Sequence, residues 1–109
     1  MVRFPRRRAM RTILDNMTPE ELSNELLELS NTYGTHSDEL GEILEGKARL
    51  WMKIREKTKS DTSAERTWNA TDMGIREVTL KLKLKAIEKR MSALRTRLRI
   101  MDTEAKNMF

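Results

Sequence analysis

The chain has 109 residues and a formal net charge of +5, with 36% charged and 38% hydrophobic residues. This length allows one domain at most. The chain has no cysteine, which excludes disulfide bridges and thiolate chemistry. No apolar run approaches the roughly 18 residues of a membrane span. The basic start lacks the apolar stretch of a signal peptide, so we expect a cytoplasmic protein.

Residues 1–17 form an Arg-rich arm. Its arginines are Arg3, Arg6, Arg7, Arg8 and Arg11, and no acidic residue precedes Asp15. A cluster of this kind suits binding to nucleic-acid phosphates, because each contact releases counterions. A solvated tail, or a tail docked on acidic residues of the chain itself, fits equally well. Residues 5–17 are expected to form a short helix whose Ile13, Leu14 and Met17 cover part of the apolar surface.

A first long helix is predicted over residues 18–58. Thr18 can cap it, Pro19 suits the first helical position, and Glu21 completes a capping box. Apolar residues then recur at alternating spacings of four and three, the pattern of a coiled-coil seam. The seam comprises Leu22, Leu26, Leu29, Tyr33, His36, Leu40, Ile43, Lys47, Leu50 and Ile54. Whether Gly34 kinks this helix stays open.

A turn at residues 59–62 and a second helix over residues 63–107 follow. A second capping box, from Thr62 to Glu65, marks the start of this helix. Its seam comprises Ala70, Met73, Glu77, Leu80, Leu84, Ile87, Met91, Leu94, Leu98, Met101, Ala105 and Met108. The matched lengths predict an all-α protein, a long antiparallel helical hairpin (coiled coil) over residues 18–109 with a short N-terminal helix.

Lys47 and Glu77 are the charged exceptions in their respective seams. Folding the chain about residue 61 places them opposite each other, so we predict that they pair and fix the register. Trp51 and Trp68 fall near the turn, where they are expected to stabilise the end of the hairpin.

Six further apolar residues lie outside the two seams, and a two-helix hairpin leaves such residues exposed. They are Leu27, Leu44, Trp51, Val78, Leu82 and Ile100. Exposed apolar patches usually contact a partner. A second copy of the chain, forming a four-helix bundle, would cover them, so we predict a homo-oligomer.

Catalytic and cofactor-binding motifs do not occur in the sequence. His36 is the single histidine, and it lies on the seam without a neighbouring set of metal ligands. No phosphate-binding glycine loop or nucleophile elbow is present. The sequence predicts a protein that is not an enzyme and carries no metal or cofactor.

Basic residues crowd the second helix. Those that flank its seam are Lys81, Lys83, Arg90, Arg95 and Arg97. They could neutralise the acidic first helix, on which Glu25 and Glu39 flank the seam, or they could form a functional basic face. With the Arg-rich arm, these five residues are the candidate nucleic-acid-binding set.

Three segments of the chain form a recognisable pattern: Thr62–Trp68, the Leu-Lys alternation from Leu80, and the Ser-Ala-Leu-Arg-Thr-Arg run from Ser92. In these segments the chain resembles small helical-hairpin accessory proteins encoded in phage early and recombination regions. The resemblance covers residues 18–107 and leaves out the Arg-rich arm. It implies a non-enzymatic role near replication or recombination, in the cytoplasm of the host cell.

The leading functional prediction is an accessory protein that oligomerises through its hairpin and binds nucleic-acid phosphates without sequence specificity. A second hypothesis is a protein-interaction module that inhibits a host or defence enzyme through Leu44, Trp51 and Leu82. A third is a sponge for signalling nucleotides, bound between subunits by cations of the second helix. The sequence does not decide between single and double strands, nor does it set the order of the oligomer.

Overall fold

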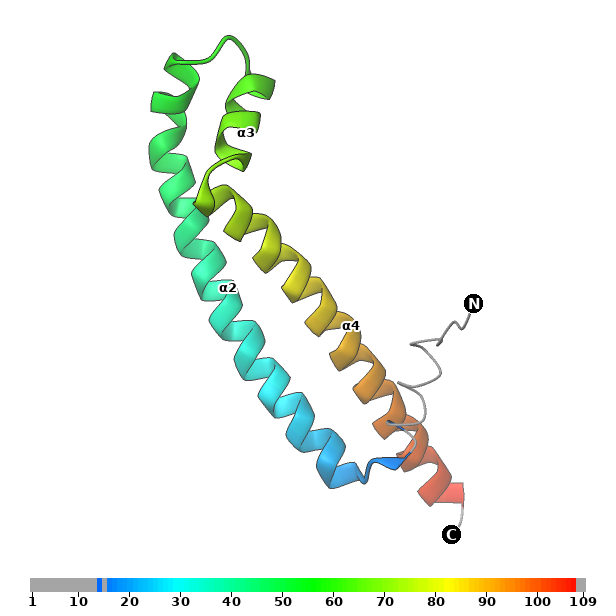
Figure 1. Cartoon of the computed structure of the whole chain (residues 1–109). Helices are drawn as coiled ribbons and strands as arrows, with labels where there is room; N and C mark the ends of the chain where they lie inside the picture. Colours follow the sequence, from blue (N-terminus) through cyan, green and yellow to red (C-terminus); the bar gives the residue numbers. More distant parts are fainter. Residues whose placement is uncertain (1–13, 15, 108–109) are drawn as a thin grey trace, which may run out of the picture. The chain divides into compact units, whose positions relative to one another are not determined.

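The computed structural model describes residue 14 and residues 16–107, and every element in that part of the chain is a helix (Figure 1). Helix α2 runs from Pro19 to Glu56, α3 from Asp61 to Asn69, and α4 from Asp72 to Asn107. The predicted all-α helical hairpin is therefore confirmed. The proposed short helix over residues 5–17 lies almost entirely outside the described residues. None of the three described helices is both long and apolar enough to cross a membrane.

Helix α2 begins where the sequence predicts. The Thr18 hydroxyl accepts a hydrogen bond from the backbone N–H of Glu21 at 3.1 Å and donates one to the Glu21 carboxylate. The first of these bonds satisfies one of the backbone N–H groups that the first turn of a helix leaves without an intrahelical partner. The helix continues without a break through Gly34 to Glu56.

The prediction of one continuous second helix over residues 63–107 is wrong, because the chain forms two helices there. Ser60, not Thr62, caps α3, and its side chain accepts a hydrogen bond from the N–H of Ser63 at 3.1 Å. The turn therefore occupies residues 57–60 and is two residues earlier than predicted. Arg55 stabilises it through an ion pair to Asp61 at 2.8 Å and a hydrogen bond to the carbonyl of Thr58.

The break between α3 and α4 depends on Gly74. The Thr71 hydroxyl donates to the carbonyl of Trp68 and accepts from the N–H of Gly74, which ends one helix and starts the next. Gly74 is buried, and a Cβ atom at this position would collide with the backbone carbonyl of Trp68. Any side chain at residue 74 would therefore push α3 away from α4.

The described chain divides into two compact units. The first combines the described residues up to Asn31 with those from Ile87 onward, and the second is residues 32–86. In the first unit Leu14, Leu22 and Leu94 form the buried core, with Met17, Leu26, Leu29, Ala93, Leu98 and Met101 packed against it. Burial of leucine side chains is the main stabilising contribution here, at about 1.5–3 kcal/mol each.

The core of the second unit comprises Ile43, Trp68 and Leu80, with Leu40 and Ile54 packed against it. Because of the helix break, the residues that α3 buries in this unit are Ala64 and Trp68, neither of which belongs to the predicted seam. Three predicted seam residues consequently lie outside this core: Ala70, Met73 and Leu50 are exposed.

Candidate nucleic-acid interface

A network of charged and aromatic side chains surrounds Glu77 in the second unit. The predicted pair forms, with Lys47 Nζ 3.4 Å from Glu77 Oε1. Lys47 also reaches Glu65 at 3.2 Å, while Lys81 Nζ lies 2.6 Å from Glu77 Oε2. The indole N–H of Trp68 donates to Glu77 Oε1 at 2.9 Å. The buried carboxylate therefore has a donor or cation on each oxygen.

The carboxyl group of Glu77 is held in its ionised form. Burial by itself raises the pKa of Glu77, because it removes water from the charged carboxylate. Hydrogen bonds from Lys81 and Trp68, together with the positive charge of Lys47, outweigh this effect and lower the pKa below its usual value. A buried carboxylate with a lowered pKa and partners on both oxygens suits a structural role rather than proton transfer.

Both tryptophans contact the cation of this network. Lys47 Nζ lies 5.6 Å from the centre of the Trp68 ring and 5.8 Å from that of Trp51, within range of a cation–π interaction. Trp51 is half-buried and Trp68 is buried. Trp51 therefore contacts Lys47 of its own helix while part of its side chain stays exposed.

A second ion pair joins α2 to α4 in the same unit. Arg76 donates from Nε and Nη2 to the two carboxylate oxygens of Glu39, each at 2.8 Å. The hydrogen bond lowers the pKa of Glu39 and raises that of Arg76, and the nearby charges of His36 and Lys83 also lower the pKa of Glu39. His36 is half-buried, and its Nδ1 atom has no hydrogen-bond partner among the described residues. Those residues contain no group of three potential metal ligands.

At least two of the five predicted cations of the second helix, Lys81 and Arg90, neutralise acidic residues among the described part of the chain. Lys81 is bound to Glu77. Arg90 donates from Nε to Glu25 at 2.8 Å in the first unit. Lys83 and Arg95 are exposed, and Arg97 is half-buried. Structural neutralisation therefore accounts for Lys81 and Arg90, whereas Lys83 and Arg95 are exposed cations.

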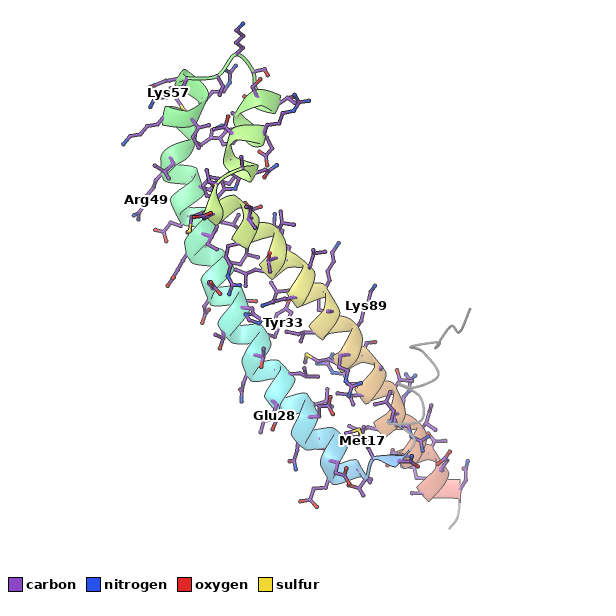
Figure 2. The ribbon with its side chains drawn as sticks, viewed as in Figure 1. Met17, Glu28, Tyr33, Arg49, Lys57 and Lys89 are labelled. Carbon is purple, nitrogen blue, oxygen red and sulfur yellow. The ribbon has the colours of Figure 1, made fainter. Side chains whose placement is uncertain are left out.

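One exposed face of α4 in the first unit carries cations and hydroxyl groups. Lys89, Ser92, Thr96 and Arg99 follow one another at spacings of three and four residues, so they share a face of the helix, and all four are exposed. Lys89 and Arg99 form no ion pair with any described residue, and Figure 2 shows Lys89 projecting outward from α4. The hydroxyls of Ser92 and Thr96 make no hydrogen bond in the described part of the chain.

A hollow of about 560 Å³ adjoins this face. Its lining residues are Leu14, Lys89, Ser92, Ala93, Thr96, Arg97 and Ile100. Leu14 is also part of the first unit's core. The five arginines of the arm, Arg3 to Arg11, lie outside the described residues.

The comparisons with known proteins give no assignment. The chain matches no known protein family, no characterised protein and no solved structure. Function therefore has to be inferred from the geometry of the described residues.

The predicted interface residues outside the seams are mostly exposed. Leu27, Leu44, Val78, Leu82 and Ile100 are exposed. Sequence reasoning missed the hydroxyls of Ser92 and Thr96 as candidate ligands, although their helical spacing from Lys89 was visible.

Proposed function

We propose that this chain is a non-enzymatic accessory protein of the kind that phages encode, and that it binds nucleic-acid phosphates in the host cytoplasm. The observation that carries the proposal is the face of α4 formed by Lys89, Ser92, Thr96 and Arg99. Its two cations have no carboxylate partner among the described residues, and its two hydroxyls have no hydrogen-bond partner there.

This combination of groups suits a phosphate backbone. Lysine and arginine supply charge, serine and threonine supply directional donors, and such contacts account for most protein–DNA hydrogen bonds. The first and last of the four are ten residues apart on α4, or about 15 Å of helix, which is long enough to contact more than one phosphate. No aromatic or amide side chain lies among the four, so binding is expected to be independent of sequence.

The Arg-rich arm supports the proposal through chain connectivity. Arg11 precedes Leu14 by three residues, and three residues span at most about 10 Å. Leu14 lines the hollow beside Lys89. Arginines near the start of the chain could therefore add phosphate contacts to those of α4.

The test is fluorescence anisotropy of labelled single- and double-stranded oligonucleotides, titrated with the full chain at about 50 and 200 mM salt. The variant carries Lys89→Gln and Arg99→Gln. Its control carries Lys57→Gln and Lys59→Gln, which remove the same charge from exposed residues of the turn (Figure 2 labels Lys57).

We expect the affinity of the unmodified chain to fall by orders of magnitude across this salt range. Losing two phosphate contacts should lower the slope of log affinity against log salt by about 1.8 for duplex DNA. The control should change the slope far less. Absence of binding at low salt, or an equal effect of the control, would contradict the proposal.

A further inference from the structure

Helix α4 has a second apolar face in the second unit. Ile75, Val78 and Leu82 recur at spacings of three and four residues and are 55%, 49% and 63% exposed. The residues buried against the second unit's core, Glu77 and Leu80 among them, lie on another face of the same helix. A helix with one solvated side normally carries polar residues there. Three large exposed aliphatic side chains in one row therefore indicate a surface that another helix covers.

Cations flank this apolar row. Lys81, Lys83 and Lys85 are exposed, and neither Lys83 nor Lys85 forms an ion pair with a described residue. A partner for this face should consequently offer carboxylates beside a surface that accepts aliphatic side chains.

The exposed face of α2 in the same unit has these properties. Asp38, Glu42 and Glu45 are exposed on it, and the ion pair of Glu45 is to Arg49 of the same helix, at 2.7 Å. Two glycines, Gly34 and Gly41, are exposed on the same side of α2, each within four residues of an acidic residue, and an added Cβ at either would meet nothing within 4 Å. The surface is therefore recessed at both positions.

The spacing of the two faces matches. Gly34 and Gly41 are seven residues apart, as are Ile75 and Leu82, and seven residues of helix rise about 10.5 Å. Two aliphatic side chains of one α4 could thus sit over two glycines of one α2, which is how a seven-residue repeat packs one helix on another.

We propose that α4 of one copy packs on α2 of a second copy of this chain through these faces. Ile75, Val78 and Leu82 lie over Gly34 and Gly41, and the lysines of α4 face the carboxylates of α2. Pairing α4 with α4 of the second copy would instead bring like charges together, which disfavours it. Each copy carries both halves of this contact, so copies either form it twice in a closed two-fold dimer or repeat it in rings or open chains. It uses none of the four residues that carry the proposed function, Lys89, Ser92, Thr96 and Arg99, so either proposal can fail alone.

Two single variants separate the halves of this contact. Leu82→Glu introduces a charge into the α4 face at an exposed position. Gly41→Arg fills the recess on α2 with a cation and replaces glycine by a stronger helix former. Thr62→Glu, at an exposed position of α3, is the control. Circular dichroism checks that each variant is helical, and sedimentation velocity measures its association over a range of concentrations.

The unmodified chain and the Thr62→Glu control should self-associate. Each of the other two variants should weaken association by about 30-fold or more, the effect expected at the centre of an interface. When the two variants are mixed, the unchanged α4 face of the Gly41→Arg chain can still pack on the unchanged α2 face of the Leu82→Glu chain. Each pair therefore keeps one intact contact. The mixture should give a 1:1 complex that grows no further.

Three results would overturn the proposal. The first is an unmodified chain that stays monomeric at all concentrations. The second is unchanged association of Gly41→Arg, which would place α4 against α4. The third is two variants that remain monomeric when they are mixed.

Discussion

The buried network around Glu77 gives the sharpest test of how this fold is stabilised. Replacing Glu77 by glutamine keeps the shape of the side chain and a carbonyl oxygen for the Trp68 indole, but removes the negative charge. Glu77 is 5% exposed, so its partners have little water to replace the lost carboxylate. The substitution therefore isolates the contribution of charge.

The expected loss follows from the partners of Glu77. Lys81, whose side chain is 53% exposed, loses a pair between residues i and i+4, worth about 0.5 kcal/mol. Lys47, whose side chain is 19% exposed, keeps Glu65 but loses its buried partner, at a cost of about 1–3 kcal/mol. We expect Glu77→Gln to lower the free energy of unfolding by about 2 kcal/mol, and Tm by about 10 °C for a domain of this size.

Urea denaturation followed by circular dichroism measures this loss. Glu65→Gln is the matched control, because Glu65 also contacts Lys47 but is 48% exposed, and it should cost less than about 1 kcal/mol. A double-mutant cycle with Lys47→Met should show a coupling energy of about 1 kcal/mol or more. Equal cost of Glu77→Gln in the presence and absence of Lys47 would refute the assignment of the effect to this pair.

Three other substitutions or conditions test separate parts of the structure. The pKa of Glu77 in the folded chain lies below its usual value of 4.5. The ionised group therefore stabilises the fold fully above about pH 4.5, and this stabilisation is lost as the pH falls through the lower, folded-state pKa. Urea midpoints measured down to about pH 3 should show the unmodified chain approaching Glu77→Gln, and a constant difference would contradict the shift. Gly74→Ala should cost about 1–3 kcal/mol in urea denaturation, since its methyl group collides with the Trp68 carbonyl, and an unchanged midpoint would remove the reason given for the helix break. Thr18→Ala should cost about 1 kcal/mol by the loss of a helix cap, with Thr18→Ser, which keeps the hydroxyl, as the control.

The sequence predicts those parts of the fold that depend on local or periodic information. Thr18 caps α2 through residues three positions away, so its role is visible in the sequence. Lys47 and Glu77 are charged residues in otherwise apolar seams, and the symmetry of a hairpin brings them together.

The helix break at residues 70–71 could not be read in the same way. Ala70 and Met73 continue the three–four spacing, and no proline interrupts it. The break depends on the contact of Gly74 with the Trp68 carbonyl, which exists once the chain is folded. The candidate site, too, is only partly predictable from the sequence. The basic character of α4 is evident there, but the hydrogen bond from Arg90 to Glu25 depends on the register of the two helices.

The placement of the two tryptophans has a practical consequence for spectroscopy. The chain contains two tryptophans and one tyrosine, and all three, Trp51, Trp68 and Tyr33, belong to the second unit. Intrinsic emission therefore reports on that unit alone, whereas the circular dichroism of the helical backbone reports on both. Melting curves recorded by the two signals will coincide where the units unfold together and will separate where one unfolds first. An unlabelled chain thus already contains the probe needed to measure how strongly its two units are coupled.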